Sequence, residues 1–257
     1  MQVWKSDRSC RIEIYQDETE CVYQIRNNFQ EIRFLQGDNL NLKAVIFDMD
    51  GVILDSEPIY YQIEKKFFKD LGIAISDEEY HTFVGLSMIE MWRRIKNNHN
   101  LKEEIEALVK NNNEVVFQHF LNSENLQPTP FLLQFIQNLL EKNIKLAVAS
   151  SSSKKLINVI LEKLMLKKYF EIYVSGNEVK NGKPAPDIFL HTANLLKVNP
   201  EECLVIEDST NGVKAAKSAS MKCVGFQNYN SGNQDLSDAD MIISSFLGLY
   251  EKIIKFL

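Results

Sequence analysis

Two aspartates, Asp48 and Asp50, close an apolar segment in the run KAVIFDMDGVILDSEP (residues 43–58) and constrain this chain more than any other feature. Residues 44–47 are all apolar, which is typical of a buried parallel strand. Side chains alternate along an extended chain, so the two carboxylates can face one point in space. Gly51 follows, where a backbone without a Cβ can turn sharply. Carboxylates this close repel each other unless a cation or a shared proton compensates them, and Mg²⁺ favours such oxygen ligands.

Apolar strands followed by polar side chains recur twice downstream. The segment LAVASSSS (residues 146–153) ends in hydroxyls, and CLVIEDSTNG (residues 203–212) contains Glu207 and Asp208 directly after its apolar part. Between them, NGKPAPD places Lys183 before two prolines, which predict an extended loop. Strands that alternate with helical segments predict an α/β fold with a doubly wound parallel sheet, whose sites form at the carboxyl ends of the strands. We therefore expect the acid pairs, the serines and the lysine to converge on one edge.

In order and spacing, these four motifs resemble those of the haloacid dehalogenase superfamily. The resemblance is to the subgroup with a helical cap inserted after the first motif, which holds small-molecule phosphatases and β-phosphoglucomutases, and it covers about residues 43–257. It implies a Rossmann-like core with an inserted α-helical cap. It also implies a Mg²⁺-dependent phosphoryl transfer in which Asp48 is the nucleophile.

The residue types suit this chemistry. The carboxylate of Asp48 can attack a phosphoryl group and form an aspartyl-phosphate. Mg²⁺ bound by Asp48, the carbonyl of Asp50 and Asp208 would neutralise the developing charge, and Glu207 would assist the metal by analogy with related members. Asp50 is the candidate general acid for the leaving group and then the base for the attacking water.

Phosphate oxygens need donors at the same edge. Ser150 would supply a hydroxyl, and Lys183 would supply a point charge. The backbone amides of Met49, Asp50 and Ser151 can add further donors, as anion-binding loops do.

Each residue also has an ordinary structural interpretation. The serines before Lys154 can cap a helix, Lys183 can be a solvated loop lysine, and Asp208 can cap a helix from Ser209 to Ala219. A helix N-terminus is itself an anion site, so capping and phosphate binding are compatible. The four motifs in series favour the functional interpretation.

Composition limits the partners. The net charge of −6 and the lack of a basic stripe argue against nucleic acid as a partner. No apolar stretch has the length of a membrane span, and the N-terminus lacks the apolar core of a signal peptide, so we expect a cytoplasmic protein without a membrane partner. The four cysteines show no CxxC spacing, so neither zinc nor redox chemistry is expected. The sequence carries no signal of oligomeric state.

The cap is expected over residues 60–127, between two parts of a core domain at residues 43–59 and 128–257. Apolar residues at four-residue spacing predict a first helix that stops at Gly72, and Ser76 with Glu79 predicts a capping box. Further helices are predicted over residues 88–96 and 102–121.

A cap loop at residues 83–87 separates two of these helices. We expect Gly85, Leu86, Ser87 and Met88 to face the substrate, and a plain helix–helix turn is the alternative. A lid of this kind excludes water and orients the remote part of the substrate.

Two positions depart from the mutases of this family. Tyr60 stands where those relatives carry a histidine, and Met88 stands where they carry an arginine that would clamp a second phosphate. The missing arginine favours hydrolysis, although Arg93 or Lys96 can substitute for it. Two scaffold positions also depart, because relatives commonly have glycine where this chain has Phe131 and Ser220.

Residues 1–42 form an N-terminal extension. The segments RIEIYQ, CVYQIR and EIRFLQ alternate apolar and polar residues as half-exposed strands do, and the acidic break at residues 17–20 suggests a hairpin turn. The extension is a β-hairpin packed on the core, a partner-binding arm, or sequence upstream of the true start.

The expected function is a Mg²⁺-dependent phosphatase of small phosphorylated metabolites, with sugar or polyol phosphates as substrates. A β-phosphoglucomutase-like mutase and a non-catalytic phosphate-binding regulatory protein are the alternatives. All four motifs retain residues that can perform the catalysis, which argues against the non-catalytic protein. A dehalogenase is disfavoured because Lys183 and Asp208 suit a phosphate and its metal.

Overall fold

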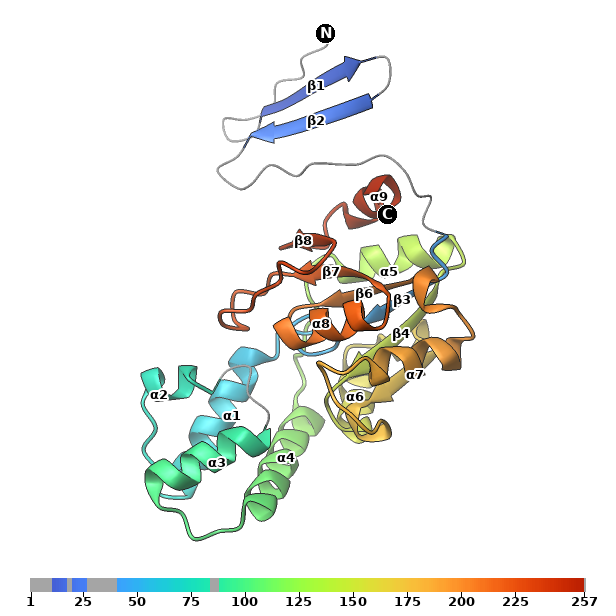
Figure 1. Ribbon diagram of the computed structural model, residues 1–257. Coiled ribbons are helices and arrows are strands. Elements are labelled where there is room, and N and C mark those ends of the chain that lie inside the picture. Colours follow the sequence, from blue (N-terminus) through green and yellow to red (C-terminus); the bar gives the residue numbers. More distant parts are fainter. Residues whose placement is uncertain (1–10, 18–19, 27–40, 84–87, 257) are drawn as a thin grey trace. The chain divides into compact units, whose positions relative to one another are not determined.

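The computed structural model describes residues 11–17, 20–26, 41–83 and 88–256 (Figure 1). The described residues fall into two units, one with residues 11–17, 20–26 and 251–256 and the other within residues 41–250. In the first unit, β1 (Arg11–Asp17) and β2 (Glu20–Arg26) pair antiparallel, with Arg11 opposite Arg26. The third alternating segment, residues 31–36, lies outside the described residues. The uses suggested for residues 1–42 stay predictions, as do the domain boundaries.

A six-stranded parallel sheet forms the centre of the second unit, in the order β5-β4-β3-β6-β7-β8. Its strands are β3 (Ala44–Phe47), β4 (Lys145–Ser150), β5 (Ile172–Ser175), β6 (Cys203–Glu207), β7 (Lys222–Phe226) and β8 (Met241–Ile243). Strand β3 lies between β4 and β6, and Phe47 is level with Val148 and Ile206. The strand order reverses at β3, so the prediction of a doubly wound α/β fold is confirmed.

Helices follow the strands and pack against them (Figure 1). They are α5 (Leu132–Glu141), α6 (Lys154–Lys163), α7 (Asp187–Leu196) and α8 (Thr210–Ser218), with 3₁₀ turns at Lys167–Tyr169, Gly176–Glu178 and Pro200–Glu202. A last helix, α9 (Leu249–Phe256), follows β8 in the chain. None of the helices in the described part of the chain combines the length and the apolar character needed to cross a bilayer.

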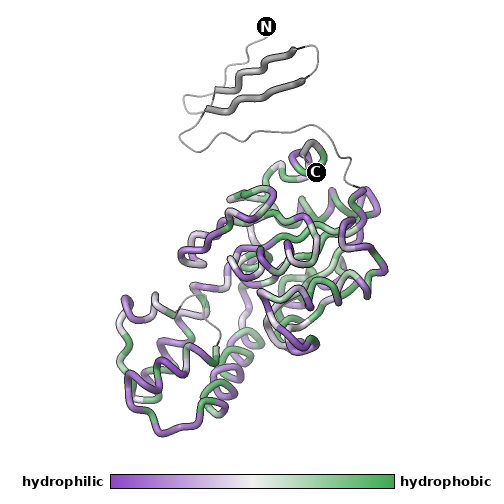
Figure 2. The backbone as a smooth tube through the Cα atoms, viewed as in Figure 1, coloured by the Kyte–Doolittle hydropathy of each residue, from purple (hydrophilic) through white to green (hydrophobic). Residues whose placement is uncertain are grey.

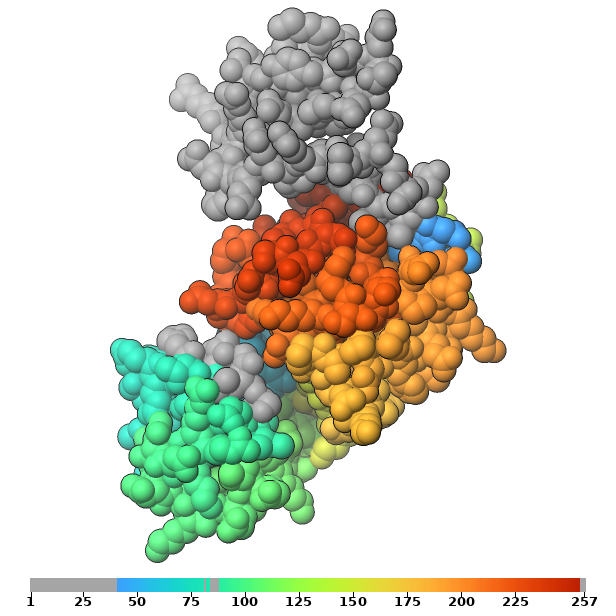
Figure 3. All heavy atoms as spheres, viewed as in Figure 1, coloured from blue at the N-terminus to red at the C-terminus, as the bar shows by residue number. Residues whose placement is uncertain are grey.

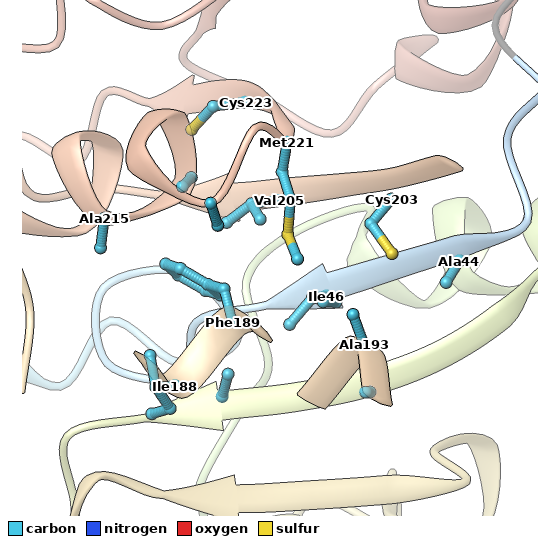
Figure 4. Close-up of a cluster of buried hydrophobic side chains, with 14 of the residues drawn as sticks. Ala44, Ile46, Ile188, Phe189, Ala193, Cys203, Val205, Ala215, Met221 and Cys223 are labelled. Carbon is cyan, nitrogen blue, oxygen red and sulfur yellow. The ribbon is translucent and has the colours of Figure 1, made fainter. Parts of the chain in front are cut away.

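Both faces of the sheet are buried. Ile46 of β3, Val205 of β6 and Phe189 of α7 belong to one buried cluster (Figure 4). The next side chain of β3, Phe47, points to the opposite face, where its ring lies 6.0 Å from that of Phe135 in α5. This two-sided burial explains why the strands are continuous apolar runs. In the tube view, the centre of the second unit is accordingly coloured mostly green, for hydrophobic residues (Figure 2). In the space-filling view, residues coloured yellow to orange, which include α7 and α8, make up much of the surface of the second unit that faces the viewer (Figure 3).

Four further helices stand between β3 and β4 in the chain. They are α1 (Glu57–Asp70), α2 (Asp77–His81), α3 (Met88–His99) and α4 (Ile105–Asn122). They share an aromatic core in which the fully buried Trp92 contacts the rings of Phe67 and Phe68. These helices form the cap.

The local signals in the cap were partly right. Helix α1 ends before Gly72, whose φ is 74°, and the Ser76 hydroxyl accepts a hydrogen bond from Glu79 N at 3.1 Å, as predicted. The reciprocal arm of the capping box is not found, because the Glu79 carboxylate bonds Asn98 and His99 of α3 instead. Helix α4 begins at Ile105 rather than at residue 102.

The two ends of the cap segment are tied together. The backbone N–H of Thr129 donates to the carbonyl of Ile53 at 2.9 Å, and the Thr129 hydroxyl donates to the carbonyl of Val52 at 2.6 Å. The chain therefore leaves the sheet for the cap and returns from it at neighbouring points.

Both scaffold positions that lack glycine adopt left-handed backbone. Phe131, directly before α5, has φ 64°, and Ser220, after α8, has φ 59°. Residues with a Cβ are strained in this region, which explains the preference for glycine there.

Candidate active site

The expected edge of the sheet brings three motifs together. Asp48 follows β3 directly, Ser150 ends β4 and Glu207 ends β6, and these are neighbouring strands. The backbone N–H of Asp48 donates to the carbonyl of Ile206 at 2.9 Å, which fixes the start of the loop. Because parallel strands end on the same side, their polar side chains face one volume.

Lys183 reaches this edge from a loop far along the chain. Its Nζ lies 2.5 Å from Asp48 Oδ1 and 2.6 Å from Glu207 Oε1, and it donates to the carbonyl of Ala149 at 3.3 Å. Its side chain is only 7% exposed, so the interpretation of a solvated loop lysine is wrong. The residues around Pro184 form a turn closed by Ala185 N and Gly182 O, with a cis Lys183–Pro184 bond, rather than the expected extended loop.

Glu207 holds Lys183. Its second carboxylate oxygen accepts from both the N–H and the hydroxyl of Ser209, at 2.7 and 2.9 Å. The carboxylate fits because α8 carries Gly212, where an added Cβ would lie 1.7 Å from Glu207 Oε1. Both oxygens are thus engaged within the protein, whereas the sequence suggested assistance to a metal.

Asp208 lies next to this pair and is buried. The hydroxyl of Ser231 donates to Asp208 Oδ2 at 2.5 Å. Gly51 makes room for it, because a Cβ there would lie 1.9 Å from the same oxygen. The structural interpretation of Asp208 as a helix cap is wrong, because Ser209 caps α8 by accepting from Gly212 N.

Asp50 is surrounded by hydroxyl donors. Ser56 and Tyr60 each donate to Oδ1 at 2.8 Å, and Ser152 donates to Oδ2 at 2.8 Å. Ser150 lies farther from Oδ2, at 3.4 Å. Tyr60 belongs to the cap helix α1, so the cap contacts Asp50 directly.

The buried carboxylates perturb one another. Burial, opposed by Lys183 and reinforced by Glu207 and Asp50, raises the pKa of Asp48 to about 7. Burial and the charges of Glu207 and Asp48 raise the pKa of Asp208 well above its usual range. Burial lowers the pKa of Lys183, but the charges of Asp48 and Glu207 outweigh it and raise this pKa above its ordinary value. These shifts reflect an excess of negative charge with a single buried ammonium.

This charge balance fits a divalent cation. Asp48 and Asp208 offer oxygen ligands, which Mg²⁺ prefers, and a cation beside them would relieve their mutual repulsion. The described residues do not bring three acidic, histidine or cysteine side chains into a ready metal cluster. A backbone carbonyl and water would therefore complete the coordination of a cation held by these two aspartates.

The expected phosphate donors lie at the same edge. Ser150 is buried, and its hydroxyl accepts from Ser152 N at 3.0 Å. The side chain of Ser151 is exposed. Among the described residues, the N–H groups of Met49 and Ser151 make no recorded hydrogen bond, which leaves them available to an anion.

The structure describes one of the four candidate cap residues, Met88. Gly85, Leu86 and Ser87 lie outside the described residues. Met88 begins α3, and its Sδ accepts from Asn112 Nδ2 of α4 at 3.3 Å.

Four side chains at the site were not predicted as site residues. They are Ser56, Tyr60, Ser152 and Ser231. Tyr60 was noted only as a departure from the mutases, and Ser152 was visible only as part of the serine run. Ser56 lies near the end of the first motif run, away from the strand end, and Ser231 lies outside every motif, so no strand-end signal marked either residue.

Comparison with known proteins places the chain in context. The model of the family described as haloacid dehalogenase-like hydrolase matches residues 45–226. A phosphorylated carbohydrates phosphatase of Thermotoga maritima is 35% identical over 181 residues, or 70% of this chain and 83% of that protein. The fructose-1-phosphate phosphatase YqaB of Escherichia coli is 31% identical, over 70% of this chain and 94% of that protein. The crystal structure of β-phosphoglucomutase from Clostridium difficile superposes with a TM-score of 0.68 at 30% identity, over 83% of this chain and 96% of that one.

Proposed function

This chain belongs to the haloacid dehalogenase-like hydrolases and is a phosphatase of that family, and from that premise we propose that it hydrolyses the phosphate monoesters of sugars or polyols. The observation that carries the proposal is the buried contact of Lys183 with Asp48 and Glu207. An ammonium clamped between two carboxylates can bind a phosphate oxygen while it holds the nucleophile. The names of the phosphatases from Thermotoga maritima and Escherichia coli support phosphorylated sugars as the substrate class.

The first step would be attack on phosphorus by a carboxylate oxygen of Asp48. The P–O bond to the leaving group breaks, and an aspartyl-phosphate forms. Lys183, the hydroxyl of Ser150 and the free N–H groups of Met49 and Ser151 would bind the oxygens of the transferred group. Glu207 holds Lys183 in place for this role.

Asp50 would act as the general acid and then as the general base of the reaction. Protonated Asp50 would give its proton to the leaving alkoxide, and the resulting carboxylate would take a proton from the water that attacks the aspartyl-phosphate. The hydroxyls of Ser56, Tyr60 and Ser152 fix the position of this carboxylate.

Mg²⁺ is the proposed cofactor. Asp48 and Asp208, with the carbonyl of Asp50, would hold it. It would supply positive charge against the developing negative charge of the phosphoryl oxygens.

Hydrolysis is favoured over the mutase reaction by one observation. A mutase must bind a second phosphate, and at Met88 this chain presents a thioether that contacts Asn112 instead of a cation. The mutase reaction is therefore the less favoured of the two candidates.

The test is phosphate release from a panel of sugar, polyol and nucleotide monophosphates, with Mg²⁺ or with EDTA. We expect metal-dependent release that Asp48→Asn lowers by at least about 1,000-fold, because the nucleophile is lost. Asp70→Asn, an exposed exchange at the end of α1, is the matched control and should keep full activity. Equal activity of Asp48→Asn and the wild type would refute the mechanism. Interconversion of sugar 1- and 6-phosphates without net release would identify a mutase.

A further inference from the structure

Two polar side chains are buried inside the cap, away from the catalytic edge. Glu64 of α1 is 5% exposed and Asn112 of α4 is fully buried. Asn112 Nδ2 lies 3.5 Å from Glu64 Oε1, at the outer limit of a hydrogen bond, and the Tyr80 hydroxyl donates to Glu64 Oε2 at 2.9 Å. Burial, opposed by these two hydrogen bonds, raises the pKa of Glu64 to about 6.

This pair is poorly satisfied by the protein itself. Asn112 Oδ1 is buried and has no hydrogen-bond partner among the described residues. Its amide group otherwise reaches only a distant carboxylate oxygen and the weak thioether acceptor of Met88. Buried polar groups are nearly always paired, and an unpaired one destabilises the fold, so this unused acceptor is a candidate partner for a group of a bound ligand.

The position of the pair relative to the catalytic edge follows from helix geometry. Tyr60 of α1 contacts Asp50, and its ring packs against Phe120 of α4 at a centroid distance of 5.8 Å. Glu64 lies one helical turn beyond Tyr60 on the same face, about 6 Å farther along the axis. Asn112 lies about two turns before Phe120 on α4, so α1 and α4 carry both residues away from Asp50. A substrate whose phosphate is at Asp48 and whose ester oxygen is at Asp50 would extend its carbon chain in this direction.

The chemistry of the pair selects its ligand. Glu64 and Asn112 Oδ1 are acceptors, so they suit hydroxyl groups, which donate. No lysine or arginine bonds to either residue within the described ranges, and Glu64 would repel a second phosphate. A neutral polyol or sugar chain meets both requirements.

We propose that Glu64 and Asn112 bind a hydroxyl on the part of the substrate remote from the phosphate, so that the enzyme selects polyol or sugar monophosphates against bisphosphates. The inference rests on the proposed phosphatase function. It adds a specificity site in the cap that the catalytic motifs do not define.

The test compares three substrates in the full-length protein. p-Nitrophenyl phosphate carries no hydroxyl chain and reports the catalytic edge alone. Sorbitol 6-phosphate carries hydroxyls remote from its phosphate, and fructose 1,6-bisphosphate carries a second phosphate. Glu64→Gln keeps the size of the side chain and one acceptor oxygen, and Glu79→Gln, which lies in the His99 network of the same cap, is the matched control.

The wild type should have a kcat/KM for sorbitol 6-phosphate at least about ten-fold above that for the bisphosphate. Glu64→Gln should lower kcat/KM for sorbitol 6-phosphate, chiefly through KM, by about ten-fold more than it lowers that for p-nitrophenyl phosphate, as expected for a lost hydrogen bond to a charged group. Glu64→Gln should also lower the ratio of kcat/KM for sorbitol 6-phosphate to kcat/KM for fructose 1,6-bisphosphate. Glu79→Gln should change none of these ratios.

Equal losses on sorbitol 6-phosphate and p-nitrophenyl phosphate would make Glu64 a purely structural residue and overturn the inference. An unchanged kcat/KM for sorbitol 6-phosphate would overturn it too. Binding of sorbitol 6-phosphate to Asp48→Asn by calorimetry separates this inference from the proposed function. If the wild type released no phosphate from any substrate while the affinity of Asp48→Asn for sorbitol 6-phosphate still fell about ten-fold on adding Glu64→Gln, the phosphatase would be refuted and the site retained.

Discussion

The hydroxyl of Tyr60 donates to Oδ1 of Asp50 at 2.8 Å, which joins the first cap helix to the proposed general acid. Burial and then the charge of Asp50 raise the pKa of Tyr60 well above its usual range, so the phenol remains a donor at neutral pH. The same Asp50 oxygen also accepts from Ser56, and two donors on one oxygen fix the plane of the carboxylate.

Tyr60→Phe should therefore lower kcat on sugar phosphates by about ten-fold, because one hydrogen bond that orients the acid is lost. Its effect on p-nitrophenyl phosphate should be smaller, since that leaving group needs no proton. Tyr61→Phe removes a hydroxyl from the adjacent residue, which donates to Asp77 and accepts from Lys65, and serves as the control. Equal losses on both substrates would show that Tyr60 does not act through Asp50.

Gly212→Ala should damage the site from a distance. The new Cβ would lie 1.7 Å from Glu207 Oε1, so the carboxylate must move and release Lys183. We expect at least about a 100-fold loss of kcat and a loss of about 1–3 kcal/mol in the free energy of unfolding, as for other overpacked positions. Gly182→Ala is the matched control, because a Cβ there meets nothing within 4 Å. Full activity of Gly212→Ala would mean that Glu207 does not need its observed position.

Glu64 should make the stability of the cap depend on pH. Its folded pKa of about 6 exceeds the ordinary value of 4.5, so the folded protein holds this proton more tightly than the unfolded chain. The resulting stabilisation is complete below pH 4.5 and is lost as the pH rises through 6. Glu64→Gln should thus raise the free energy of unfolding by about 2 kcal/mol at pH 8, with little change at pH 4. Urea unfolding at both pH values measures this difference, and equal effects at both would contradict the assigned cause.

Placing glycine at the two left-handed positions should stabilise the fold. Phe131→Gly and Ser220→Gly each remove a Cβ from a backbone with positive φ, and we expect a gain of about 1 kcal/mol in the free energy of unfolding. Ser218→Gly, at the end of α8, should instead destabilise the protein. Thermal unfolding compares the three variants. A loss at Ser220→Gly would show that its side chain contributes more than its backbone strain removes.

The sequence was sufficient for the three central strands β4, β3 and β6 and for the residues that end them. Asp48, Ser150 and Glu207 follow apolar runs, and parallel pairing then brings them to one edge whatever the details of the loops. Lys183 was expected at the same edge, but its contacts with Asp48 and Glu207 were not, because a lysine before two prolines follows no strand that would position it.

The missed contacts depend on tertiary structure. Tyr60 reaches Asp50 only because α1 leaves the loop after β3 in one particular direction, and Ser231 reaches Asp208 from a loop beyond β7. The orientation of Glu207 depends on the absence of a side chain at Gly212, which is invisible until α8 is packed. Propensity and periodicity describe single helices and strands, so they contain no information on contacts between side chains of different elements.

The hydrogen bonds from Thr129 to the carbonyls of Val52 and Ile53 hold the start and the end of the cap segment next to each other on the sheet domain. The cap is therefore one continuous insertion with a single point of attachment. Replacing everything between these hydrogen-bonded residues would leave the strand ends and Lys183 untouched, and the new segment would have to supply donors to Asp50 in place of Ser56 and Tyr60. Cap helices from a relative grafted at these junctions should therefore bring that relative's substrate preference to the reaction centre of this chain. New specificity can arise in this scaffold by exchange of one continuous segment, without rebuilding the catalytic edge.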